Sequence, residues 1–390
     1  MNDLTSDALP LTGIRVADFS RVLAGPYASM LLADLGADVV KVERPHIGDE
    51  TRSWGPPFTA GESAYFLSVN RNKRSLLIDM QADEDRLLAQ KLIKSSDVFL
   101  HNFKNGDDLK LGLDRGSVTG INPRIIYAAI SAFGRTGPDA NKPGYDLLAQ
   151  ALTGFMSING SAEGPSYKIG VALVDILTGL NTALGIVASL YERGQGGTAR
   201  RVDSSLLEVG LSSLVNVASS YLLTQNNPKR HGNAHPNIVP YQEFMCTDAA
   251  LVIAVANNKQ FGGLARALSR NDFLENPDYA DNPSRVRHRL ALCGEIAAIF
   301  KTKSRESWLN ILEGHQVPCA PVNQLSDVFE SAQVATLQSV TEVEHPKIPR
   351  LPQVAAGLRL DDKLLPIRTP PPLLGQHDDE LREELAKIVL

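Results

Sequence analysis

The stretch that decides the fold is IRVADFSRVLAGPYASMLLADLGADVVKVE, residues 14–43. Its first apolar run predicts a strand over 14–19, and its last predicts another over 39–43. Between them, Pro26 suits the first turn of a helix and Gly36 suits its end. A strand, a helix and a strand within about thirty residues make a right-handed βαβ unit. The stretch therefore predicts the start of a parallel sheet.

The same alternation of strands and helices continues to about residue 225. Short apolar runs predict further strands, and apolar residues at helical spacing predict the helices between them. The expected strands are 75–79, 97–101, 124–131 and 201–203, and the expected helices are 83–94, 146–157, 176–193 and 204–225. This alternation is typical of an α/β domain built on a parallel sheet.

The chain changes character after residue 225, where a loop-rich segment leads to strands 241–246 and 251–256 and to helices near 261–269 and 290–301. Prolines in the tail exclude a central strand or a long helix, so the tail should wrap back before a terminal helix over 377–388. The expected parts are a large α/β domain over 1–225, a smaller α+β domain over 226–330, and a C-terminal segment over 331–390 that returns to the large domain.

Composition indicates an enzyme-sized globular protein, because 43% of the 390 residues are hydrophobic and 21% are charged. A net charge of −5 argues against a nucleic-acid partner, which requires a basic excess. The three cysteines show no C-x-x-C spacing, which argues against a zinc site and a disulfide framework.

The acidic N-terminus lacks the apolar core of a signal peptide, and the chain contains no run of 18 uncharged apolar residues. We therefore expect a cytoplasmic protein with no membrane partner. A mitochondrial matrix protein from which a transit peptide had been removed would show the same pattern.

Several residues suggest binding sites of different kinds. The turn after the first strand lacks the G-x-G-x-x-G pattern, which argues against NAD. His231 and His235 are four residues apart in a non-helical segment without a third ligand nearby, so we expect no metal. Arg44 ends the second strand, where it is either a phosphate partner or a surface arginine. Arg52 beside Trp54 would suit a carboxylate substrate.

Asp175 is flanked by apolar residues at the expected start of a helix. It is either the N-cap of this helix, worth about 1 kcal/mol, or a carboxylate nucleophile. Burial raises the pKa of a carboxyl group, and a helix N-terminus lowers it. A carboxylate that stays ionised while poorly solvated attacks acyl groups well, so Asp175 is the main candidate for catalysis.

Four stretches together carry a resemblance that covers nearly the whole chain. They are 11–26, 35–45, 70–75 and 370–377. In this order they resemble the class III CoA-transferases, the family of formyl-CoA transferase, carnitine CoA-transferase and α-methylacyl-CoA racemase. Segments 51–58, 232–242 and 256–261 are most similar to its succinyl-CoA:glutarate (hydroxymethylglutarate) branch.

The resemblance implies a Rossmann-like large domain, a smaller domain and a homodimer of two interlocked subunits. It also implies no permanently bound cofactor, with a coenzyme A thioester as substrate. The family's catalytic aspartate falls on Asp175, and its CoA-contacting positions fall on Val22, Arg44, Asn102, Phe103 and Lys110.

Three positions and one segment depart from the patterns of family members. Lys110 and Leu23 stand where formyl-CoA transferase has an arginine and a glutamine, and the segment 232–236 replaces its glycine-rich loop. The change at Leu23 and the replaced loop argue against formate and oxalate as substrates. Tyr145 stands where the racemases have a histidine. A neutral tyrosine, with a reference pKa near 10, is a poor base at pH 7, so racemisation is disfavoured.

The expected reaction transfers CoA from an acyl-CoA such as succinyl-CoA to a dicarboxylic acid such as glutarate. Asp175 would pass through an aspartyl anhydride and an aspartyl-CoA thioester. We expect Arg52 to bind the distal carboxylate of the acid and His235 to line the acceptor pocket. The alternatives are an acyl-CoA racemase or isomerase of the same family and a CoA-binding protein without catalytic activity.

Overall fold

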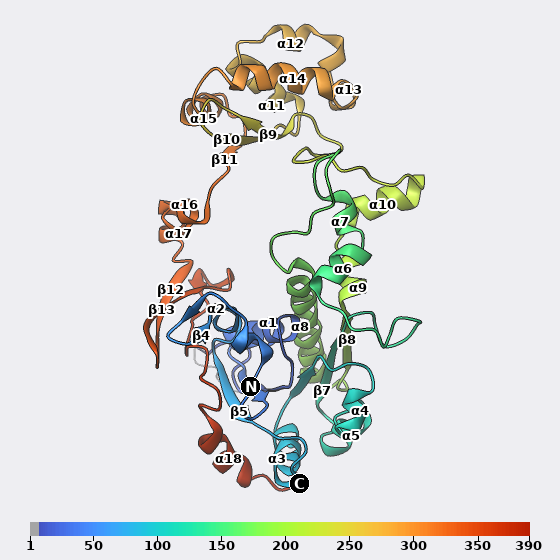
Figure 1. Cartoon of the computed structure of the whole chain (residues 1–390), viewed down its shortest axis with the longest axis vertical. Helices are drawn as coiled ribbons and strands as arrows, with labels where there is room; N and C mark the ends of the chain where they lie inside the picture. The colour runs from blue at the N-terminus through green and yellow to red at the C-terminus, as the bar shows by residue number, and fades with distance from the viewer. Residues whose placement is uncertain (1–7) are drawn as a thin grey trace. The chain divides into compact units, whose positions relative to one another are not determined.

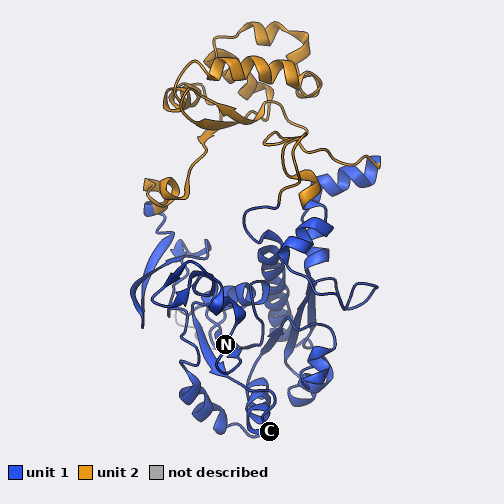
Figure 2. Ribbon diagram, viewed as in Figure 1, with its two compact units in different colours: residues 1–155, 168–224, 335–390 blue, residues 156–167, 225–334 orange. Residues whose placement is uncertain are grey.

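The computed structural model describes residues 8–390, which form two compact units (Figure 2). The first unit contains the described residues up to 155 together with 168–224 and 335–390, and the second contains 156–167 and 225–334. Residues 156–167, which the sequence analysis placed in the large domain, thus belong to the second unit. Most of the acidic N-terminal stretch, on which the expected localisation rests, lies outside the described residues.

The first unit is built on a six-stranded parallel sheet with the order β5-β2-β1-β6-β7-β8 (Figure 1). Its strands are β1 (Arg15–Asp18), β2 (Asp38–Glu43), β5 (Lys73–Leu77), β6 (Val98–His101), β7 (Ile126–Ser131) and β8 (Arg201–Ser205). The predicted parallel sheet is confirmed. Within this sheet the strands follow the Rossmann order 3-2-1-4-5-6, in which the direction of winding reverses between β1 and β6.

Helices cover both faces of this sheet. On one face, α1 (Ala24–Asp34) and α8 (Leu173–Gly194) pack against side chains such as Val16 and Val39. On the other face, α3 (Asp83–Lys94), α5 (Arg115–Ile121) and α18 (Asp378–Ala386) pack against Ala17 and Val40. Successive residues of a strand face opposite layers, which is why the central strands are buried almost throughout.

A glycine allows α8 to approach α1 closely. A Cβ atom at Gly179 would lie 2.6 Å from the backbone oxygen of Ala24, so no larger residue fits without a shift of one helix. Gly179 lies one turn after Asp175 in α8. The contact therefore places the first turn of α8 beside the start of α1.

Two predicted helices are broken. The helix expected over 146–157 is interrupted at Gly154, whose φ of 94° favours glycine, and forms α6 (Asp146–Leu152) and α7 (Phe155–Ile158). The helix expected over 204–225 forms α9 (Leu206–Ser212) and α10 (Val215–Thr224), which meet at a 78° bend. Val215 has a φ of 43°, a left-handed conformation that a continuous helix does not contain.

Short elements complete the first unit. The segment after β2 forms η1 (Glu50–Ser53), β3 (Phe58–Thr59), β4 (Glu62–Ser63) and α2 (Ala64–Ser68), and the segment after β6 forms α4 (Asp107–Lys110). The proline-rich tail stays outside the main sheet, as predicted, and forms the antiparallel pairs β12 (Val340–His345) with β13 (Ile348–Val354) and β14 (Arg359–Leu360) with β15 (Lys363–Leu364). It ends in the predicted terminal helix, α18, which packs against α3 and β5.

The second unit contains a three-stranded antiparallel sheet of β9 (Tyr241–Met245), β10 (Ala250–Ala254) and β11 (Cys319–Pro321). The two strands and two helices predicted here are confirmed, and β11 was not expected. Sheet and helices share one apolar core. These helices are α11 (Asn258–Ala267), α12 (Asp272–Glu275), η2 (Pro277–Tyr279), α13 (Asn282–Arg287), α14 (Arg289–Phe300) and α15 (Arg305–Gly314). Two short helices, α16 (Leu325–Phe329) and α17 (Ala332–Thr336), follow β11 and contribute no residue to this core, and α17 crosses the boundary back to the first unit.

Among residues 8–390, α8 is the one helix that is long and apolar enough to cross a membrane by length and composition. The bent pair of α9 and α10 passes the same test only when it is counted as one span. Core helices pass this test as well, and one face of α8 is buried against α1 and the sheet.

Candidate active site

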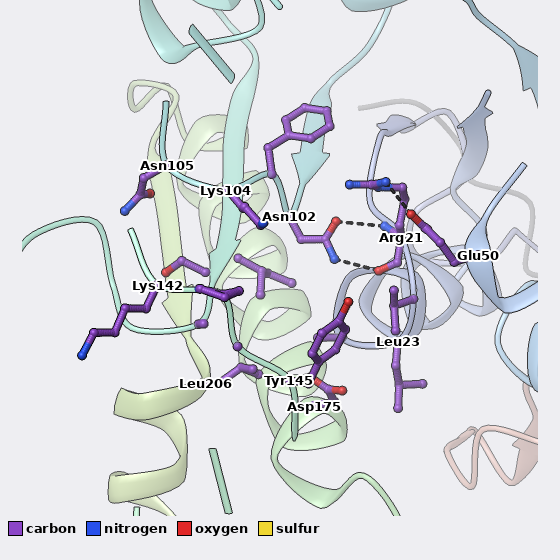
Figure 3. Close-up of a pocket in the computed structure, with 18 of the residues that line it drawn as sticks. Arg21, Leu23, Glu50, Asn102, Lys104, Asn105, Lys142, Tyr145, Asp175 and Leu206 are labelled. Atoms are coloured by element: carbon purple, nitrogen blue, oxygen red, sulfur yellow. Dashed lines mark hydrogen bonds and ion pairs between the residues drawn. The ribbon is translucent and has the colours of Figure 1, made fainter. Parts of the chain in front are cut away.

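The sheet builds an elongated site at its carboxyl edge, where the strand order reverses. The residues that follow β1 and β6 line a pocket that Asp175 of α8 closes (Figure 3). A second cavity of about 600 Å³ lies beyond the ends of β2 and β5. Arg21 and Phe103 line both, so the two cavities adjoin. Ligands of open α/β sheets bind in this crevice.

Asp175 lies in the first turn of α8 and is 9% exposed. The helix starts after Ala172, and its N-terminus is capped from another element, because the backbone N–H of Val174 donates to Oδ1 of Asp146 at 2.8 Å. Within the described part of the chain, no hydrogen bond or ion pair reaches the Asp175 carboxylate, and only its backbone N–H is engaged. The interpretation of Asp175 as the N-cap is therefore wrong, and its carboxylate is available for chemistry.

The environment of Asp175 shifts its ionisation toward neutral pH. Burial raises the pKa of Asp175 to about 7, and the negative charge of Asp146 contributes to the rise. Gln150 Nε2 donates to Oδ2 of Asp146 at 2.6 Å, which fixes the orientation of this neighbouring carboxylate. When Asp175 is ionised it has little solvation, and it is then a stronger nucleophile than a surface aspartate.

The raised pKa predicts that Asp175→Ala stabilises the fold. The folded-state pKa of Asp175 is about 7, above the ordinary value of 3.8, so ionising Asp175 lowers the free energy of unfolding. This loss of stability grows as the pH rises from 3.8 to about 7 and is fully present above that pH. We expect thermal denaturation to show a Tm increase of a few degrees at pH 8 and a smaller one at pH 5. Asp114 caps α5 through the N–H of Gly116, so Asp114→Ala should lower the Tm. A lower Tm for Asp175→Ala at both pH values would contradict this account.

A strained turn between β1 and α1 forms one wall of the site. Val22 has a φ of 71°, which is rare for a β-branched residue. Its N–H donates to Asp49 at 3.2 Å, and Asp49 pairs with the buried ammonium group of Lys41 at 2.9 Å. The side chain of Asn102 also exchanges two hydrogen bonds with the backbone of Arg21 (Figure 3). These contacts hold the turn in place where the cavities meet.

An aromatic pocket of about 350 Å³, lined by Trp54, Tyr65 and Tyr145, also borders Asp175. The rings of Trp54 and Tyr65 pack edge to face with their centroids 5.2 Å apart. Burial, followed by the charge of Asp175, raises the pKa of Tyr65 to about 12, so its hydroxyl stays a hydrogen-bond donor. The arrangement suits an acyl compound with its carbonyl at Asp175 and its chain against the aromatic rings.

Comparison with known proteins identifies the family. The model of CoA-transferase family III matches residues 11–378. Succinyl-CoA:glutarate CoA-transferase of Mus musculus is 40% identical over 97% of this chain and 87% of that protein, and succinate–glutarate CoA-transferase of Agrobacterium fabrum is 38% identical over 100% and 98%. The crystal structure of a CAIB/BAIF family protein from Brucella suis matches with a TM-score of 0.87 and 38% identity, over 97% of this chain and 100% of that one. The chain belongs to CoA-transferase family III.

A CoA-transferase of this family has to hold a long anionic thioester, and the two adjoining cavities provide a path for one. The side chains of Arg44 and Lys110 are 50% and 77% exposed. The structure brings the predicted CoA contacts to these cavities, with Val22, Asn102 and Phe103 beside Asp175 and with Arg44, Phe103 and Lys110 in the larger cavity.

One of the two residues predicted to bind the acceptor acid, Arg52, lies in the same unit as Asp175. Arg52 makes a bidentate pair with Glu43, with Nε–Oε2 and Nη2–Oε1 distances of 2.7 and 2.8 Å. The Arg52 side chain is 11% exposed and lines neither pocket beside Asp175. Its guanidinium is paired with Glu43 within the fold, and the role of Arg52 as a partner of a distal carboxylate stays a prediction. His235 lies in the second unit, and its role stays a prediction.

The sequence analysis missed residues that the fold brings to this site from separate elements. Tyr65 and Asp146 come from α2 and α6 and carried no local motif. Trp54 was considered only as the neighbour of Arg52, yet Trp54 is the one of the two that lines both pockets beside Asp175. Within residues 8–390, no group of three or more His, Cys, Asp or Glu side chains is placed to hold a metal ion.

Proposed function

We propose that the chain transfers CoA from succinyl-CoA to a dicarboxylic acid such as glutarate, with Asp175 as the covalent nucleophile. One observation carries the proposal: the buried Asp175 carboxylate has no partner within the described residues and borders two pockets. The relatives named after succinyl-CoA and glutarate support this choice of donor and acceptor.

In the first half of the proposed reaction, the ionised Asp175 carboxylate attacks the thioester carbonyl of succinyl-CoA. The C–S bond breaks, CoA leaves as a thiolate, and the succinyl group forms a mixed anhydride with Asp175. The thiolate then attacks the aspartyl carbonyl. Succinate leaves as a carboxylate, and CoA remains on Asp175 as a thioester.

In the second half, the carboxylate of the acceptor acid attacks the aspartyl thioester and displaces the CoA thiolate, which gives a second mixed anhydride. The thiolate attacks the acceptor carbonyl of this anhydride, so that the new acyl-CoA forms and the Asp175 carboxylate is restored. No proton is consumed overall. One thioester replaces another, so the reaction has no need of ATP.

Each step of this mechanism develops negative charge on a carbonyl oxygen, and the start of α1 offers donors for it. Leu23 and Ala24, at the start of α1, both line the pocket with Asp175. Within the described residues, their backbone N–H groups donate to no acceptor. Orphan N–H groups at a helix N-terminus stabilise an oxyanion when it forms within hydrogen-bond distance. We assign this role to α1.

A homodimer is part of the same proposal. The first unit exposes large apolar side chains on its long helices, including Leu180, Leu184 and Tyr191 on α8 and Leu223 on α10, with exposures of 43% to 85%. Large apolar side chains exposed in this number support burial by a second subunit.

Mass spectrometry of acyl-CoA products tests the proposed function. The protein is mixed with succinyl-CoA and, in turn, with glutarate and with other C4 to C6 dicarboxylic acids. We expect glutaryl-CoA to appear together with one equivalent of succinate. The kcat/KM for a diacid one methylene group longer or shorter should be at most about 10- to 200-fold lower than that for glutarate, because one methylene group changes the binding free energy by about 1 to 3 kcal/mol. Deuterium exchange at the acyl α-carbon with no acyl-CoA product would favour an isomerase instead.

A further inference from the structure

Arg21 occupies the junction of the two cavities. It lines the pocket that Asp175 closes and also the larger cavity beyond β2 and β5, a property that it shares with Phe103 alone among the described residues that line either cavity. A thioester that reached from the larger cavity to Asp175 would therefore pass Arg21. The sequence analysis did not single out this residue.

The structure holds the backbone of Arg21 firmly. Its N–H donates to Oδ1 of Asn102 at 2.9 Å, and Nδ2 of Asn102 donates to its carbonyl oxygen at 2.7 Å (Figure 3). The next residue, Val22, donates its N–H to the buried Asp49. The Arg21 side chain is 38% exposed and starts from this fixed backbone, so little conformational freedom is lost when it binds a ligand.

One carboxylate oxygen orients both arginines of this region. Arg21 Nη1 lies 2.6 Å from Oε1 of Glu50 (Figure 3). Arg44 Nη2 lies 3.1 Å from the same oxygen. The other oxygen of Glu50, Oε2, is buried and has no hydrogen-bond partner. Two guanidinium groups on one carboxylate leave a net positive charge, and each guanidinium has N–H donors beyond the one that faces Glu50.

We infer that Arg21 binds the diphosphate of CoA, together with Arg44, and that Glu50 positions both side chains for it. Guanidinium groups suit phosphate oxygens because their N–H donors match them in pairs. The diphosphate lies between the nucleoside and the pantetheine arm, which matches the place of Arg21 between the two cavities. The inference rests on the proposed function, since it assumes a CoA thioester that spans both cavities.

The test compares wild type and Arg21→Gln with three donors: succinyl-CoA, succinyl-dephospho-CoA and succinyl-pantetheine. The second lacks only the 3′-phosphate, and the third lacks the whole nucleotide with its diphosphate. We expect the variant to raise the KM for the first two donors about tenfold or more, because a charge-assisted contact is lost. The KM for succinyl-pantetheine should stay unchanged, and kcat should fall little with any donor.

Three results would overturn the inference. A KM increase that disappears with succinyl-dephospho-CoA would place Arg21 at the 3′-phosphate. An equal increase for all three donors would place it at the thioester, and no increase for any would give it no role. Arg350 pairs with Glu342 at 2.7 Å outside both cavities, so Arg350→Gln is the matched control and should change no KM.

Direct binding separates this inference from the proposed function. Calorimetry with CoA, dephospho-CoA and pantetheine needs no turnover. Arg21→Gln should lower the affinity for CoA and for dephospho-CoA by the same factor and leave the affinity for pantetheine unchanged. If wild type binds CoA but transfers none, the proposed function fails and the binding data still decide the role of Arg21. Arg21→Lys keeps the positive charge but not the paired N–H donors, so its affinity for CoA should lie between those of wild type and Arg21→Gln.

Discussion

Asp175→Asn is expected to lower the kcat of CoA transfer by at least about 1,000-fold, because the amide cannot form the anhydride or the thioester that carry the reaction. The substitution keeps the size of the side chain. Its carboxylate makes no hydrogen bond within the described residues that folding depends on, so the variant should fold and bind CoA normally. Steady-state kinetics together with calorimetry of CoA binding would show the two effects separately.

Asp114→Asn serves as the control for this substitution. Asp114 caps α5 in the same unit and lies outside the pockets beside Asp175, so its variant should transfer CoA at the wild-type rate. If Asp175→Asn retained more than a tenth of the wild-type kcat, Asp175 would not be the nucleophile. The covalent mechanism would then have no candidate in this pocket.

The rate of transfer should also depend steeply on pH. With the pKa of Asp175 at about 7 in the free protein, kcat/KM should fall about tenfold for each pH unit below that value, because only the ionised carboxylate attacks. Between pH 8 and pH 5 the loss should be about 100-fold. If Asp175 had to be protonated to act, kcat/KM would instead rise as the pH falls.

Asp146→Asn provides the companion variant for the pH profile. It removes the negative charge that helps to raise the pKa of Asp175, while an amide oxygen can still accept the N–H of Val174. The midpoint should therefore move to lower pH, but burial, the larger cause, should keep it above the ordinary value of 3.8. A profile that stayed flat between pH 5 and pH 8 in the wild type would contradict the environment described for Asp175.

Much of the first unit could be predicted because its signals are local and repeated. The stretch 14–43 contains a complete βαβ unit, and the next central strands, β6 and β7, are short apolar runs. The broken helices were missed for a physical reason. Apolar spacing runs across Gly154 and Val215, and only the left-handed backbone conformation at these residues reveals the interruption.

The site was harder to predict, because its chemistry depends on pairs that are distant in sequence. Whether Asp175 caps its own helix depends on Asp146, which lies 29 residues earlier and takes over the cap. The guanidinium of Arg52 looked available until the fold placed Glu43 against it. Asp175 could be singled out from its apolar flanks at a helix start, and the predicted CoA contacts came from the resemblance to a family. Arg21 carried neither signal and emerged from its position between the cavities.

Peptide mass spectrometry of the acylated protein tests the central claim most directly. The protein is incubated with succinyl-CoA without an acceptor acid, quenched in acid and digested. The account predicts a CoA thioester on the peptide that contains Asp175, absent from Asp175→Asn and removed when glutarate is added before the quench. A protein that releases glutaryl-CoA at full rate without any adduct on this peptide, or with an adduct on another residue, would contradict it.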